Sequence, residues 1–157
     1  MEIELKHRFL IVQMANNKSE LRKLRLQVQM SIDGCIAGPN GEIDWMVGPS
    51  DYELLKYVTK ITDSVDTILL GRKMTDVFIS YWLDRMNKPD DPWNAFAKRM
   101  IEIQKVVFTK IPNKSEWINT DIATGDLLEV IKIKGQNGRD IVVYGGASFD
   151  SSLIYEK

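Results

Sequence analysis

The sequence predicts one α/β domain, with a largely parallel sheet and helices on both of its faces. Strand-like and helix-like segments alternate along the chain, and such alternation is typical of parallel strands joined by helices. Three of the expected strands run directly into glycine-bearing loops. The 157 residues, 44% hydrophobic and 27% charged, are enough for one ordinary globular core.

The expected strands are recognised by two patterns. Lys23 to Ser31 alternates apolar and polar residues, which is typical of a strand with one buried face. Short apolar, β-branched runs are typical of buried strands, and they lie at 66–70, 105–108 and 141–144. Trp117 and Ile118 are expected to form a further short strand.

Helices are expected between these strands. Ser50 and Glu53 match a capping box that opens a helix over Ser50–Thr62. Tyr81–Asp91 is expected to be a loop, because it is rich in Asn, Asp and Pro. The other expected helices run over Asp76–Trp82 with Thr75 or a neighbour as cap, from Pro92 to Ile101, from Thr124 to Ile131, and from Ala147 onward.

The chain is expected to divide into an extension, residues 1–21, and one domain, residues 22–157. Within the extension, Arg8–Met14 is a candidate strand and Ala15–Glu20 reads as a polar linker. The N-terminus lacks the basic and long apolar segments of a signal peptide.

Composition excludes several classes of function. With 21 basic and 22 acidic residues the net charge is −1, so nothing favours nucleic acid or an anionic membrane as a partner. No apolar run is long enough to cross a bilayer. Cys35 is the only cysteine and His7 the only histidine, which disfavours a metal cluster or a Ser–His–Asp triad and fits a reducing cytoplasm.

Three glycine-bearing loops follow expected strands and suggest a phosphate-binding edge. They contain Ile36–Gly38, Gly71–Thr75 and the pair Gly145-Gly146. A helix that begins after a glycine turn aims unpaired N–H groups at an anion. Each loop alone also has an interpretation without a ligand. In chain order, these are a plain surface loop, a surface turn with two solvated cations, and a tight turn. Because parallel strands end at one edge, the three together predict one nucleotide-sized ligand.

Four segments resemble the dihydrofolate reductase superfamily, especially the reductase domain of the riboflavin-biosynthesis deaminase-reductase. They are SIDGCIAG (Ser31–Gly38), DTILLGRKM (Asp66–Met74), KVVFTK (Lys105–Lys110) and DIVVYGGAS (Asp140–Ser148), in the family's order. The resemblance covers about residues 22–150 and implies a three-layer αβα fold with a mostly parallel, mixed sheet.

The resemblance implies an NADPH-dependent reductase that transfers hydride to a small heterocycle or to another C=N or C=O bond. Expected contacts with the nicotinamide end come from Ile36, Ala37 and Gly38. Arg72, Thr109 and Lys110 are expected near the 2′-phosphate, which suits a guanidinium, a hydroxyl and an ammonium. The diphosphate and adenosine contacts are expected from Gly71, Arg72, Lys73, Met74, Thr75, Gly145, Gly146, Ala147 and Ser148.

Two departures from the family pattern affect the chemistry. Met74 stands where the family usually has Thr, and Thr75 is the candidate replacement from the next position. Asp51 follows Trp45 at nearly the distance of the acidic residue in dihydrofolate reductases. It is a candidate for assisting substrate protonation, or an ordinary first-turn acid of a helix. Asp33 also belongs to the family motif, and shaping its own loop is the ordinary reading of its role.

Family members continue with two or three further strands beside the first one, whereas this chain ends at Lys157. We therefore expect Leu24–Met30 to lie at a sheet edge, which favours pairing with another chain and a homodimer. The alternatives are coverage by Arg8–Met14 or a truncated product with impaired activity. The competing function is a non-catalytic nucleotide-binding or self-associating domain. The riboflavin-pathway reduction itself would require a ribose-phosphate site, for which no second basic cluster is seen.

Overall fold

The computed structural model describes residues 21–43, 52–110, 117–124 and 128–155. Ser50, Asp51 and the candidate strand Arg8–Met14 lie outside these ranges. The elements are β1 (Leu24–Leu26), α2 (Tyr52–Asp63), β2 (Val65–Gly71), α3 (Arg72–Met86), α4 (Asn94–Glu102), β3 (Gln104–Phe108), β4 (Thr120–Ala123), α5 (Leu128–Lys134), β5 (Asp140–Tyr144) and α6 (Ala147–Tyr155).

The five strands form one sheet in the order β1-β5-β2-β3-β4, and every neighbouring pair is parallel. This confirms the predicted parallel α/β domain. The antiparallel part of the expected mixed sheet is not seen among the described strands. β2 lies at the centre, and from Thr67 to Gly71 its residues are buried, because neighbouring strands and helices enclose it.

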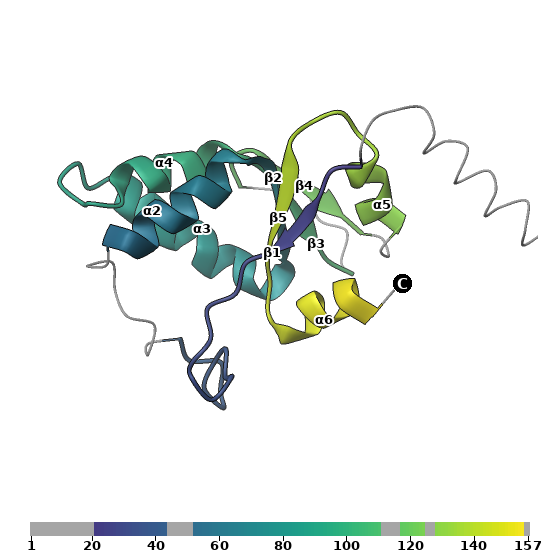
Figure 1. Cartoon of the computed structure of the whole chain (residues 1–157), viewed down its shortest axis with the longest axis horizontal. Helices are drawn as coiled ribbons and strands as arrows, with labels where there is room; N and C mark the ends of the chain where they lie inside the picture. The colour runs from purple at the N-terminus through teal and green to yellow at the C-terminus, as the bar shows by residue number, and fades with distance from the viewer. Residues whose placement is uncertain (1–20, 44–51, 111–116, 125–127, 156–157) are drawn as a thin grey trace, which may run out of the picture.

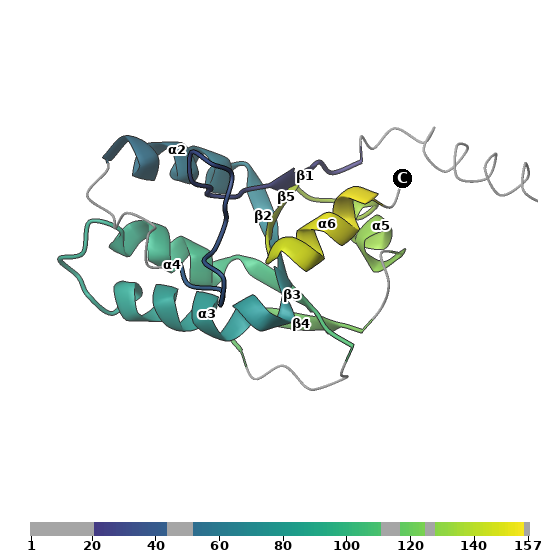
Figure 2. The same cartoon turned by 90° about the horizontal axis from the view of Figure 1, so that it is seen from below.

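Helices cover both faces of the sheet, which gives the predicted three layers (Figures 1 and 2). Ile68 and Leu70 of β2 face the layer of α2, α3 and α4, in a cluster with Phe78, Phe96 and Met100. Leu69, between them, faces the opposite layer of α5 and α6, where Val130 and Ile133 are buried and Phe149 and Leu153 pack against the cluster. The alternation along β2 thus assigns successive residues to opposite layers.

Several element boundaries differ from the sequence prediction. β1 stops at Leu26, well before Ser31, because its partner β5 ends at Tyr144 and gives way to the glycine pair. The fourth strand is Thr120–Ala123, so the prediction at Trp117-Ile118 was wrong. The residues of β4 carry no clear apolar pattern and become a strand by pairing with β3.

The start of α3 was also predicted wrongly. The helix begins at Arg72 with Gly71 as N-cap, and it continues to Met86, into the expected loop. Thr75 is therefore inside the first turn, fully buried, and its hydroxyl donates to the Gly71 carbonyl at 3.2 Å. At the other end the Asn94 amide donates to the carbonyls of Arg85, Met86 and Lys88, which joins α3 to α4.

The beginning of β1 is anchored by a buried arginine. Arg22 is 6% exposed and forms an ion pair with Asp66 next to the start of β2. It also donates to Thr67 Oγ1 at 2.7 Å and to the carbonyls of Arg139 and Ile133. One guanidinium thus connects the chain before β1 with β2, with the end of α5 and with the residue before β5.

The outer edge of β1 carries exposed apolar side chains. Leu26 is 44% exposed, and Met30, beyond the end of the strand, is 60% exposed. Among the described strands, β1 pairs only with β5. The homodimer expected from this edge stays a prediction. No described helix is long and apolar enough to cross a membrane.

Lys105 on β3 is fully buried, and its ammonium group donates to the carbonyls of Ile101 and Ile103 at 2.7 Å each. Burial lowers the pKa of Lys105 to about 8 from about 10.4 in an unfolded chain. Between these values the unfolded chain binds more protons than the folded one, so Lys105 makes folding more favourable as pH rises.

We therefore expect the free energy of unfolding of the wild type to rise between pH 7.5 and pH 10, relative to Lys105→Met, by on the order of 2 kcal/mol. The two hydrogen bonds to carbonyls stabilise the charged ammonium group, so the change in the free energy of unfolding stays below the value that the full pKa shift would give. Urea unfolding at both pH values measures it, and parallel pH profiles of the two proteins would contradict it.

Candidate functional site

Two of the three predicted glycine-bearing loops, those that begin at Gly71 and Gly145, lie side by side at the carboxyl edge of the sheet. Leu70 of β2 pairs with Tyr144 of β5, and Gly71 pairs with Phe108 of β3. The segments that leave these three strands, beginning at Arg72, Thr109 and Gly145, therefore start from adjacent positions. The loops Gly71–Thr75 and Gly145-Gly146 were predicted to converge, and their closeness is a direct result of parallel pairing in this register.

The strand order makes the boundary between β2 and β5 a topological switch point. β2 leads into α3, which covers one face, and β5 leads into α6, which covers the other (Figure 2). Where neighbouring parallel strands send their connections to opposite faces, ligands bind beyond the carboxyl ends. Gly71 caps α3 without a side-chain hydrogen bond. The first N–H groups of α3 thus have no side-chain cap, which is a suitable arrangement for an anion.

The two glycines of the pair have different surroundings. A Cβ atom on Gly145 would lie 2.2 Å from Asp150 Oδ1 and 2.7 Å from Phe149 Cδ1, whereas a Cβ on Gly146 would meet nothing within 4 Å. Gly145 therefore lacks a side chain because α6 packs against it. Gly146, which is exposed, is the glycine that leaves room for a ligand.

Phe149 and Asp150 are site residues that the sequence did not reveal. A Cβ on Gly71 would lie 3.3 Å from that of Phe149, and the ring of Phe149 lies 5.3 Å from the ring of Phe108. Asp150 is 6% exposed, its Oδ1 has no hydrogen-bond partner among the described residues, and burial raises the pKa of its carboxyl group. No sequence pattern indicates that Phe149 packs against both Gly71 and Gly145, or that Asp150 packs against Gly145.

Arg72 contacts two neighbouring side chains, Asp76 and Trp117. Its Nη1 lies 2.8 Å from Asp76 Oδ2, and its guanidinium carbon lies 5.1 Å from the centre of the Trp117 ring. Lys73 is exposed and Met74 is half-buried. Because Thr75 is buried and bonded to Gly71, the structure does not bring its hydroxyl to the surface in place of the residue expected at Met74.

The remaining expected cofactor contacts lie at the rim. Thr109 is half-buried, and its N–H donates to the Ala123 carbonyl at 3.0 Å. Lys110, Ala147 and Ser148 are exposed. The Gly146 carbonyl, just before α6, accepts hydrogen bonds from the N–H groups of Phe149 and Asp150.

The loop after β1 is closed on itself in its described part. Gly38 N–H donates to the Glu42 carbonyl at 2.8 Å, and Ser31 N–H donates to the Cys35 carbonyl at 2.9 Å. The Ser31 hydroxyl donates to Asp33, which lowers the pKa of that carboxyl. Asp33 thus shapes its own loop. Ile36, Ala37 and Gly38 are half-buried within this loop, and Figure 1 shows the loop beyond the same end of the strands as the start of α6.

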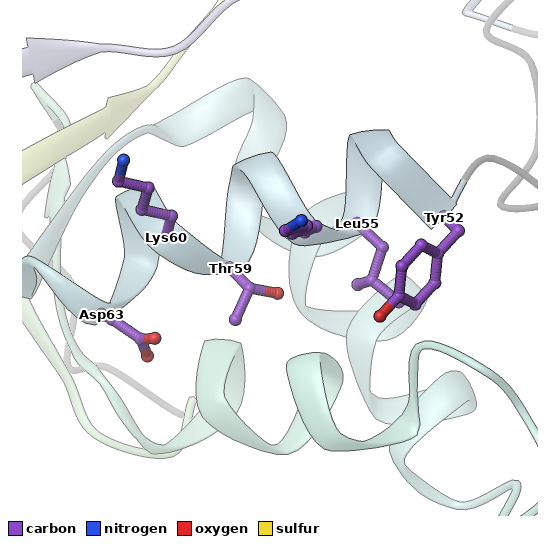
Figure 3. Close-up of a pocket in the computed structure, with 6 residues that line it drawn as sticks. Tyr52, Leu55, Thr59, Lys60 and Asp63 are labelled. Carbon is purple, nitrogen blue, oxygen red and sulfur yellow. The ribbon is translucent and has the colours of Figure 1, made fainter.

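A separate shallow hollow lies along α2 (Figure 3). Its lining comes from one helix and includes no residue expected to bind a cofactor: Tyr52, Leu55, Lys56, Thr59, Lys60 and Asp63. Among the described residues, no group of His, Cys, Asp or Glu side chains is arranged to hold a metal ion.

Comparison with known proteins gives a family that agrees with this geometry. A Bacillus subtilis (strain 168) protein, "Uncharacterized protein YyaP", is 34% identical over 145 residues, which are 90% of this chain and 71% of that protein. A Thermotoga maritima diaminohydroxyphosphoribosylaminopyrimidine deaminase/5-amino-6-(5-phosphoribosylamino)uracil reductase matches in structure with a TM-score of 0.54 and 17% identity, over 85% of this chain. This chain spans 42% of that protein's length.

A Shewanella sp. PV-4 protein, assigned by its name to riboflavin biosynthesis, has a TM-score of 0.54 and 19% identity, over 83% of this chain and 69% of that one. At these identities the two structures show a common fold. The sequence model of the RibD C-terminal domain matches residues 22–157. The chain therefore belongs to the RibD C-terminal domain family, whose dihydrofolate reductase-like fold it shares.

Proposed function

We propose that this protein binds NADPH along the carboxyl edge of β2, β3 and β5 and reduces a small substrate at a C=N or C=O bond. The observation that carries the proposal is the register that sets Gly71 beside β3 and Leu70 beside Tyr144. It brings the starts of α3 and α6 to adjacent strand ends from opposite faces. Membership of a reductase-like family supports the same chemistry.

The residues present suit a phosphorylated dinucleotide. Gly146 leaves open space in front of the first turn of α6, where Ala147 and Ser148 are exposed and a diphosphate would accept hydrogen bonds. Bound NADPH would supply the hydride. In this proposal Gly71, Lys73 and Met74 line the adenosine side, Arg72, Thr109 and Lys110 bind the 2′-phosphate, and Ile36–Gly38 line the nicotinamide. Asp51 remains the proposed proton donor.

The alternative is a domain that binds a nucleotide without catalysing a reaction. The placement of Thr75 favours it, because the hydroxyl expected near the diphosphate is buried against Gly71. The packing of Phe149 and Asp150 against Gly145 also favours it, since the chain itself fills the space at one of the two glycines.

Titration with NADPH and with NADH tests the proposal. We expect NADPH to quench the fluorescence of the four tryptophans and to raise the melting temperature more than NADH does. NADPH oxidation is then followed with pterins, pyrimidine ribosides, a phosphoribosylaminopyrimidine and aldehydes. Turnover of any of these supports the reductase, and binding without turnover supports the alternative. No binding at millimolar NADPH contradicts both.

A further inference from the structure

Trp117 is the residue outside the expected site that most directly contacts it. The guanidinium carbon of Arg72 lies 5.1 Å from the centre of the Trp117 ring, within the range of a cation–π contact. Trp117 belongs to the connection between β3 and β4, and it packs against the core cluster shared by α2, α3 and α4. The core therefore holds the indole in place, and the indole in turn supports Arg72.

Asp76 holds the guanidinium from another side. It follows Arg72 by one helical turn, and its Oδ2 accepts from Nη1 at 2.8 Å. Among the described residues, the Nη2 and Nε donors of Arg72 have no hydrogen-bond partner. An exposed ion pair of this kind fixes a side chain only weakly. The added contact with the indole restricts the plane of the guanidinium and leaves these donors available to a second anion.

The nature of that anion follows from the position of Arg72. Arg72 comes directly after Gly71, which pairs with Phe108, and Thr109 leaves the neighbouring strand at the same edge. A guanidinium fork forms two parallel hydrogen bonds to a phosphate monoester. A ribose hydroxyl cannot use the positive charge in this way. An oriented Arg72 therefore favours a dinucleotide with a 2′-phosphate over one without it.

We propose that Trp117 is a positioning residue that holds the Arg72 guanidinium ready for the 2′-phosphate and so sets the preference for NADPH over NADH. This inference rests on the proposed function. It adds a residue, from a different connection of the sheet, whose effect passes entirely through Arg72. Because the indole does not touch the phosphate in this arrangement, its removal weakens only ligands that carry the 2′-phosphate.

The test compares Trp117→Leu, which removes the aromatic face, with Trp117→Phe, which keeps one. Dissociation constants are measured for NADPH, NADH and adenosine 2′-monophosphate. We expect W117L to weaken NADPH and adenosine 2′-monophosphate by about tenfold and W117F by about twofold. NADH binding stays within about twofold of the wild type in both variants. Melting temperatures verify that each variant is folded, and Trp117→Met replaces W117L if that variant is not.

A double variant tests whether Trp117 acts through Arg72. In an Arg72→Met background, W117L is expected to cause no further loss of NADPH affinity. Equal weakening of NADH and NADPH, or additive losses in the double variant, would overturn the inference while leaving NADPH binding itself intact. A wild type that binds neither dinucleotide would overturn both the inference and the proposed function.

Discussion

Replacing Arg22 by Met is expected to lower the free energy of unfolding by about 3 kcal/mol. Arg22 is 6% exposed and pairs with Asp66 while donating to Thr67 and to two backbone carbonyls. Breaking a buried ion pair on one side leaves the other charge without compensation, which costs about 3–5 kcal/mol. The lower end applies here, because the Asp66 side chain is 33% exposed and keeps a bond from Arg139 N–H.

Arg25→Met is the matched control, because it removes the same type of side chain from the same strand region. The Arg25 side chain is 44% exposed and pairs with Asp140 at 2.6 Å, so its loss is expected to cost less than about 1 kcal/mol. Urea unfolding followed by tryptophan fluorescence measures both variants. Equal losses in the two would show that Arg22 is no more important than a surface arginine.

The second large effect is expected at Gly145. In Gly145→Ala the new methyl group would lie 2.2 Å from Asp150 Oδ1 and 2.7 Å from Phe149 Cδ1, so these two packed side chains, or the start of α6, must move. Forcing a group into such a packed position costs about 1–3 kcal/mol. Neither glycine of the pair has a positive φ. The substitution therefore tests the lack of room for a methyl group and not backbone strain.

Gly146→Ala has the opposite expected profile. Nothing lies within 4 Å of the added methyl group, so stability should change by less than about 0.5 kcal/mol. The methyl group would occupy the space proposed for the diphosphate, and the NADPH dissociation constant should rise on the order of tenfold. Thermal unfolding and NADPH titration of both variants separate the two roles. Normal NADPH affinity in folded G146A would count against a ligand at this turn.

The sequence predicted those parts of the fold in which a single segment determines its own structure. The apolar runs at 66–70, 105–108 and 141–144 are strands. Their short, β-branched, apolar composition suits a buried strand whichever strands lie beside it. The extent of β1 depends on where β5 ends, and β4 depends on pairing with β3. Neither dependence is visible within the segment itself. Thr75 was mistaken for a helix cap because its hydroxyl bonds within the helix, to Gly71, instead.

The candidate site likewise has one feature that could be predicted from the sequence and others that could not. The gathering of the strand ends at one edge could be predicted, because it follows from parallel alternation alone. The contacts of Phe149 with Gly71 and Gly145, and of Trp117 with Arg72, could not be predicted. They depend on how α6 and the β3–β4 connection approach the sheet, which local patterns do not specify.

The pairing of β1 with β5 has a consequence for the synthesis of the chain. The Ile141 N–H bonds to the Lys23 carbonyl, and Arg22 bonds to carbonyls 111 and 117 positions away in sequence. A nascent chain emerging from the ribosome therefore offers this arginine only Asp66 and Thr67 as side-chain partners until almost the whole described sheet has been translated. Long-range parallel contacts of this kind raise contact order and slow folding. We infer that β1 joins the sheet only after β5 is available, because β5 is the only described strand with which β1 pairs.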